Sequence, residues 1–274
     1  TLPEHMDLLM NNAEKLVINK GVTLTTNYVQ GQDFTVNGIW NLNGLVNVYG
    51  KLTVNGKLNL LNGGMYLRNG GTINGLENVT KRYENQNLSY YWDVRTVSDI
   101  EDAIAASKTT TDGLPHGMNM CVDGTLTLDK SLTLPKNMEQ FSIWGNGTLI
   151  IPKGITFTTY ATQMYLSCNT QVKGKFVNNS NITFYSPATF TVTGTYSGKG
   201  QLKVYNQNGE TKLSQIVKGL DLDAYIVREY ENWGSHWWEI LDPNYVTQLG
   251  TPRNLKWHKR LQWNSDGSGK LVDA

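Results

Sequence analysis

Acidic residues are missing from two long parts of this 274-residue chain, and charge in general is scarce. No Asp or Glu occurs between Asp33 and Glu77, or between Glu139 and Glu210. Charged residues make up 17% of the sequence, and the formal net charge is +1. A chain so close to neutrality has no strong field to attract nucleic acid or an anionic membrane surface. We therefore expect no nucleic-acid partner and no membrane insertion.

The common signatures of catalytic and metal sites are also missing. No Gly-x-Ser-x-Gly elbow, phosphate loop, His-Glu-x-x-His or Cys-x-x-Cys occurs, and the four histidines show no ligand spacing. Enzymes that cleave polysaccharides need paired carboxylates, and a calcium site on a sheet face needs acidic ligands. The acid-free stretches argue against a polysaccharide-cleaving site and against a calcium site on the sheet faces. We expect no catalytic residue, no bound metal and no cofactor.

Long apolar runs are absent, and cysteine is rare. No run of 18 apolar residues predicts a membrane-spanning helix, and the first thirty residues lack the apolar core of a signal peptide. In strand alternation Cys121 points away from the apolar face that carries Met118 and Met120, whereas Cys168 lies on an apolar face. The two cysteines therefore make a poor disulfide pair.

Glycine and asparagine are abundant, and the glycines are regularly spaced. From 38 to 60 every even position is apolar or glycine, and Gly38, Gly44, Gly50 and Gly56 recur every six residues. Alternation predicts half-buried β-structure, but one straight strand of this length would be several times the usual. A β-solenoid with glycine corners fits the spacing, and a meander with Asn-Gly hairpins is the alternative. We favour the solenoid because hairpins would leave only about four residues per strand.

A second, less regular β block follows at 124–206, and a helix is predicted before each block. In "TVSDIEDAIAASK" Ser98 is the expected N-cap, with Glu101 three residues on as its capping-box partner. The segment 3–16, "PEHMDLLMNNAEKL", reads as a weaker helix. Each helix would cover an open end of a solenoid, where bare strand edges invite aggregation.

The two halves of the chain share a motif, which predicts a tandem duplication. Both 75–94 and 219–240 run from Gly-Leu-acid through Tyr-Glu-Asn to two adjacent aromatic residues, an acid and a branched apolar residue. We therefore expect an all-β fold of two tandem parallel β-solenoid units, each preceded by a short capping helix. The predicted domains are 1–94, 95–247 and a third part at 248–274.

Aromatic clusters at the end of each unit are the candidate ligand-binding residues. Flat rings beside polar groups can form a sugar-binding platform, and they can also form a packed cap over the last coil. Recurrence in both units favours the cap. The candidate set is Trp233, His236, Trp237, Trp238 and Glu231 in the second unit, and Tyr90, Tyr91, Trp92 and Glu84 in the first.

Two stretches resemble known families. The blocks at 16–75 and 118–206, with phrases such as "GTLTL" and "GTLIIPKG", resemble the solenoid regions of adhesin-like surface proteins of Gram-positive bacteria. "TPRNLKW" near the C-terminus resembles the opening strand of fibronectin type III modules. These resemblances imply a secreted or cell-wall-attached location and a fragment of a longer modular protein.

The function expected from the sequence is that of a non-catalytic extracellular module in adhesion or as a stalk. Its partners would be glycans or a host or cell-wall surface, bound through the aromatic clusters. Two alternatives stay open: a polysaccharide lyase or glycosidase with a right-handed β-helix, and a phage-type tail fibre, which would form an elongated trimer.

Overall fold

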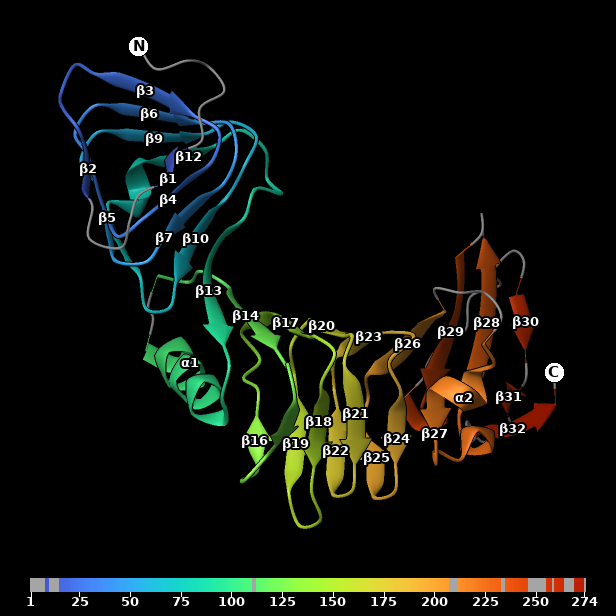
Figure 1. The fold of residues 1–274 in the computed structure, drawn as a ribbon. Helices are drawn as coiled ribbons and strands as arrows, with labels where there is room; N and C mark the ends of the chain where they lie inside the picture. The colour runs from blue at the N-terminus through green and yellow to red at the C-terminus, as the bar shows by residue number, and fades with distance from the viewer. Residues whose placement is uncertain are drawn as a thin grey trace. The chain divides into compact units, whose positions relative to one another are not determined.

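The computed structural model describes residues 8–9, 15–109, 112–206, 211–232, 235–245, 255–257, 259–263 and 269–273. The chain is an all-β protein with few helices, a parallel β-solenoid of about nine turns. It divides into two compact units (Figure 1): residues 1–93 with 105–117, and residues 94–104 with 118–274. In the described part of the chain, no helix is both long and apolar enough to cross a membrane.

The first unit is a three-sided coil, with one short strand on each side in every turn (Figure 1). Its strands on the first side are β2 (Lys15–Ile18), β5 (Asp33–Val36), β8 (Lys51–Val54) and β11 (Thr72–Asn74). The second side holds β3 (Thr23–Thr26), β6 (Ile39–Leu42), β9 (Lys57–Leu60) and β12 (Val79–Lys81), with the 3-10 turn η1 (Leu76–Asn78) before β12. The third side holds β1 (Leu8–Leu9), β4 (Val29–Gly31), β7 (Val46–Val48), β10 (Met65–Arg68) and β13 (Leu88–Val94).

The second unit repeats the three-strand turn. One side is formed by β14 (His116–Cys121), β17 (Met138–Trp144), β20 (Gln163–Leu166), β23 (Asn181–Tyr185) and β26 (Gln201–Asn206). The other two sides hold β15 (Thr125–Thr127), β18 (Thr148–Ile151), β21 (Asn169–Val172), β24 (Phe190–Val192) and β27 (Val217–Lys218), and β16 (Leu132–Thr133), β19 (Thr156–Thr159), β22 (Lys175–Asn178) and β25 (Thr195–Ser197).

The parallel pattern stops at the end of the second unit. After the short helix α2 (Leu213–Ile216) and the 3-10 turn η2 (Leu222–Ala224), the strands β28 (Ile226–Asn232) and β29 (Ser235–Leu241) form an antiparallel hairpin. β29 also pairs antiparallel with β26, the last coil strand on that side. The segment beyond holds η3 (Pro243–Tyr245), β30 (Leu255–Trp257), which pairs with β28, and the hairpin of β31 (Lys259–Trp263) and β32 (Gly269–Asp273).

The structure confirms the predicted solenoid. Each six-residue interval between glycines corresponds to one side of the coil. Stacked residues such as Asn37 and Asn55 are 18 residues apart, so three sides share 18 residues in this part of the first unit. Neighbouring coil strands pair in parallel, for example Phe34 with Leu52 and Trp40 with Leu58, which excludes the hairpin meander. The glycines at 38, 44, 50 and 56 lie at the corners between strands.

Close approach between turns explains why the corners are glycine. A Cβ on Gly56 would lie 2.0 Å from the carbonyl oxygen of Gly38, and one on Gly44 would lie 2.1 Å from that of Asn27. The corner backbone therefore rests directly on the backbone of the turn before it. Space between turns, rather than freedom to bend, is the reason for these glycines.

The predicted alternation is also confirmed in the core. The apolar residues at even positions from Trp40 to Leu60 are all at most 1% exposed, whereas Lys51 and Lys57 point outward. The core of the second unit is richer in phenylalanine, with contacts such as the one between Phe157 and Phe176, whose ring centroids are 5.2 Å apart. Met118 and Met120 are buried, and Cys121 and Cys168 are both free thiols, as expected.

Asparagine ladders stabilise the outside of the first unit. Asn55 donates its side-chain amide to the Asn37 oxygen at 2.8 Å, and Asn59 donates to the Asn41 oxygen at 2.9 Å. Both pairs join the same two neighbouring turns, and stacked amides of this kind satisfy each other as they do in cross-β structures. The ladders explain part of the high asparagine content.

The helix predictions need three corrections. α1 (Val97–Thr109) exists, but its capping box is Thr96 and Asp99, and the expected partner Glu101 pairs instead with Lys130 at 2.7 Å. The helix predicted over 3–16 is wrong for the described residues of that segment, because Leu8–Leu9 is a strand and a second strand, Lys15–Ile18, begins before its end. α1 follows β13 and interrupts the coil, so the arrangement of one capping helix before each unit is not observed.

The two segments of the shared motif also differ in structure. Tyr83, Glu84 and Asn85 lie in a turn, whereas Tyr230 and Asn232 lie in the strand β28. β13 pairs in parallel with β10, while β29 pairs antiparallel on both sides. The two similar sequence segments therefore do not form equivalent structural elements.

The corner argument predicts that Gly56→Ala destabilises the protein. The added methyl group would overlap the Gly38 carbonyl, and overpacking of this kind costs about 1–3 kcal/mol. The matched control is Gly124→Ala, where a Cβ would meet nothing within 4 Å. Chemical denaturation should show a clearly lower free energy of unfolding for Gly56→Ala and little change for Gly124→Ala. Equal denaturation midpoints for the two variants would contradict the corner argument.

The observed cap predicts that Thr96→Ala lowers the stability of the protein more than Ser98→Ala does. Thr96 Oγ1 accepts the amide hydrogen of Asp99, and loss of an N-cap costs about 1 kcal/mol. The Asp99 carboxylate accepts the amide hydrogens of Arg95 and Thr96, which lower its pKa, so this contribution fades as pH falls through that pKa. Thermal unfolding at pH 7 should detect the loss in Thr96→Ala alone; a larger loss in Ser98→Ala would support the cap at Ser98.

Candidate ligand-binding surfaces

An aromatic row crosses the outer face of four neighbouring strands in the second unit. Tyr185 on β23, Tyr205 on β26, Trp237 on β29 and Tyr230 on β28 are paired in register. Their ring centroids are 5.6 Å apart for Tyr185 and Tyr205, 5.6 Å for Tyr205 and Trp237, and 5.1 Å for Trp237 and Tyr230. All three pairs are stacked. The row ties the antiparallel hairpin to the last coil.

Both faces of the Trp237 ring are already in contact. Tyr205 stacks on one side and Tyr230 on the other, and the Lys203 ammonium lies 4.6 Å from the Trp237 ring centroid. Glu239 accepts a hydrogen bond from the Tyr230 hydroxyl at 3.0 Å. A sugar ring stacks on an open aromatic face, so this arrangement favours a structural role for Trp237.

The neighbouring predicted residues lie on the opposite face of the hairpin. Trp238 is 4% exposed, and His236 packs against it with ring centroids 4.3 Å apart. His236 Nε2 is hydrogen-bonded to Glu229 Oε1 at 2.8 Å. Trp238 and Glu229 line a cavity of about 350 Å³ together with Leu213 of α2. Trp233 and the side chain of Glu231 lie outside the described residues.

The predicted aromatic cluster of the first unit is also divided. Tyr90 is buried, its ring stacks on His116 with centroids 4.9 Å apart, and its hydroxyl donates to Asp112. Burial, followed by the Asp112 hydrogen bond, raises the pKa of Tyr90 above its ordinary value. Trp92 is half-buried, and Glu84 is exposed in the turn 82–87. Tyr91 points to the outer face of the sheet.

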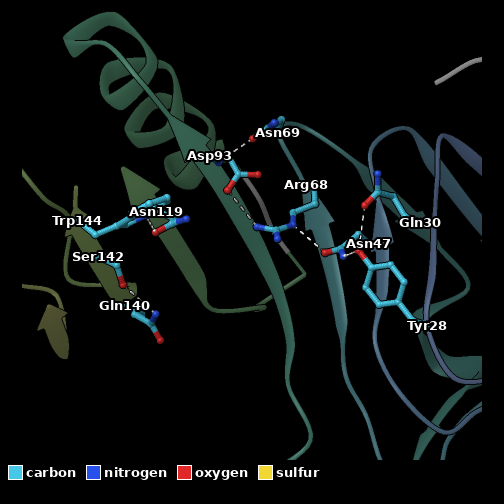
Figure 2. Close-up of polar contacts among 10 residues, drawn as sticks. All are labelled: Tyr28, Gln30, Asn47, Arg68, Asn69, Asp93, Asn119, Gln140, Ser142 and Trp144. Atoms are coloured by element: carbon cyan, nitrogen blue, oxygen red, sulfur yellow. Dashed lines mark hydrogen bonds and ion pairs between the residues drawn. The ribbon is translucent and has the colours of Figure 1, made fainter. Parts of the chain in front are cut away.

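A polar network centred on Arg68 lies beside Tyr91, and Figure 2 shows Arg68 with Asn47, Tyr28 and Asp93. Arg68 donates to Asn47 at 2.8 Å and pairs with Asp93 at 3.4 Å, while its guanidinium lies 4.5 Å from the Tyr91 ring centroid. Asn47 in turn donates to the Tyr28 hydroxyl at 3.0 Å. One arginine therefore holds side chains from successive turns together.

The sequence did not reveal this network. The hydrogen-bonded partners are far apart in the sequence: Asn47 and Tyr28 by 19 residues, Arg68 and Asn47 by 21, and Arg68 and Asp93 by 25. Because the turn length changes along the coil, no fixed repeat identifies the partners. The available signal was the alternation itself, which puts Asn47 and Arg68 among the polar residues of apolar strands.

A second tryptophan stands on the outer face of the second unit (Figure 2). Trp144 of β17 is 45% exposed, and its indole nitrogen donates to Asn119 of β14 at 2.7 Å. Among the residues that the structure describes, no group of three or more His, Cys, Asp or Glu is arranged to hold a metal ion.

The row predicts that Trp237→Ala destabilises the end of the second unit. Two stacked aromatic pairs are lost, each contributing about 0.5–1.5 kcal/mol beyond area burial, so the free energy of unfolding should fall by about 1–3 kcal/mol. Trp144→Ala is the control, because that ring is exposed. Denaturation that affects both variants alike, or neither, would contradict the structural role of Trp237.

In comparisons with known proteins, no protein-family model, no curated protein and no solved structure matches this chain.

Proposed function

We propose that this chain is a non-catalytic module of a secreted or cell-wall-attached surface protein, where it acts in adhesion or as a stalk. The observation that carries the proposal is the stacking of short parallel strands, with the core and the glycine corners repeated from turn to turn. Stacked turns extend each unit by about 4.8 Å per turn. Such a coil is suited to holding a surface at a distance.

Three carboxylates of the outer surface support a role without catalysis. Asp93 pairs with Arg68, Glu239 lies 3.7 Å from Arg228, and Asp33 pairs with Lys15 at 3.5 Å. Each of these acids has a basic partner. A glycosidase mechanism instead needs two carboxyl groups that flank the same glycosidic bond.

Glycans are the partners that the outer faces fit best. The outer face of the first unit places the tyrosine rings at 66 and 91 beside the polar side chains of Gln30 and Arg68. Aromatic rings beside amides and a guanidinium suit polyhydroxylated ligands. In the full proposal, two tandem solenoid units precede a fibronectin type III-like module that starts within 248–274.

The proposal predicts binding without turnover. The purified chain should bind isolated Gram-positive cell walls or an immobilised glycan array, and it should release no new reducing ends and no unsaturated products from neutral or acidic polysaccharides. Cleavage would instead identify the β-helix enzyme. Sedimentation equilibrium should show no trimer, since an elongated trimer would support the tail-fibre alternative.

A further inference from the structure

A small pocket lies in the first unit where the corner between β9 and β10 meets the turn between β12 and β13. Its volume is about 310 Å³, at the lower end of the range for ligand pockets. Four amide side chains and two tyrosines line it: Asn62, Asn85, Gln86, Asn87, Tyr66 and Tyr83. None of the residues that line it is charged.

Gln86 is the buried polar residue of this pocket. It is 6% exposed, and its Oε1 accepts the amide hydrogen of Tyr83 at 2.9 Å, which fixes the orientation of the side-chain amide. Its Nε2 has no hydrogen-bond partner among the described residues. A buried donor without a partner is costly, and natural proteins keep few of them. A ligand oxygen would satisfy this donor.

The surrounding residues leave the pocket open. Gly63 and Gly64 form part of its wall, and a Cβ on Gly63 would lie 1.4 Å from the Gly44 carbonyl oxygen, so no side chain can fill this corner. Tyr83 is 48% exposed, and one side of its ring faces the Arg82 guanidinium at 5.2 Å. Tyr66 also belongs to the outer face described above, where its ring contacts Tyr91.

We propose that this pocket binds one neutral sugar unit of a glycan. Side-chain amides carry both donors and acceptors, a combination that matches adjacent sugar hydroxyls, and the tyrosine rings can pack against the apolar face of a pyranose. A charged ligand would lose hydration here, and no residue in the lining of the pocket carries a charge to compensate for it. The inference rests on the proposed adhesive function and gives it a site and a ligand class.

The test measures binding of the full chain to cellohexaose, maltohexaose and chitohexaose by isothermal titration calorimetry, with hexagalacturonate as the charged comparison. The wild type should bind at least one neutral oligosaccharide and should bind the charged one at least tenfold more weakly. Equal or tighter binding of hexagalacturonate would overturn the neutral-ligand assignment.

Two variants test the pocket itself. Gln86→Glu keeps an acceptor for the Tyr83 amide hydrogen but removes the unpaired donor, and Tyr83→Ala removes the exposed ring while keeping that backbone amide. Each should weaken neutral-sugar binding at least tenfold. Tyr160→Ala, at a 37% exposed tyrosine of the second unit outside the pocket, should not change it. A melting curve unchanged from wild type shows that a variant is folded, and Tyr83→Ala alone suffices if Gln86→Glu unfolds.

The outcomes separate this inference from the function it rests on. Neutral-sugar binding that survives in a folded Tyr83→Ala variant overturns the pocket and leaves the adhesive module intact. Failure of the wild type to bind any of the three neutral oligosaccharides, while it still binds cell walls, likewise overturns the pocket alone. Failure to bind cell walls, the glycan array and the oligosaccharides removes both proposals.

Discussion

The close contact of one turn's backbone with the next is the constraint on which the rest of the structure depends. At the corners the chain comes so near to the turn before it that a Cβ at Gly56 or Gly63 would overlap a carbonyl oxygen. This approach allows parallel strands to pair on three sides at once, and it fixes which residues face inward. The buried row from Trp40 to Leu60, the asparagine ladders and the outer network around Arg68 all follow from that stacking.

Much of the coil could be read from the sequence, because period-two alternation and six-residue glycine spacing are local signals. They predicted the solenoid, its corners and its core in 38–60. The N-terminal helix failed because Leu8 and Leu9 pair with Val29 and Gln30, and this long-range strand pairing overrides local helix propensity. The cap of α1 was misplaced because two capping-box patterns overlap, and only the one that starts at Thr96 precedes the helix.

The candidate site was harder to predict for a physical reason. Trp237 and Trp238 are adjacent in sequence, so the strand β29 sends them to opposite faces, one into the aromatic row and one into the interior. Likewise Tyr90 is buried while Tyr91 is on the outer face. Aromatic residues that are adjacent in the sequence therefore do not lie on the same face of a strand. The network around Arg68 and the pocket at Gln86 assemble residues from several turns, whose spacing varies.

The most direct test of this account is a disulfide between stacked corner positions. Asn37 and Asn55 lie one turn apart with their side-chain amides hydrogen-bonded at 2.8 Å, so Asn37→Cys with Asn55→Cys should cross-link under mild oxidation. The background would be Cys121→Ser and Cys168→Ala, and the pair Asn43→Cys with Asn55→Cys, on different corners, would be the control. Cross-linking of the first pair alone is the result that the stacked coil predicts. Cross-linking of the control pair instead, or of neither pair, would contradict it.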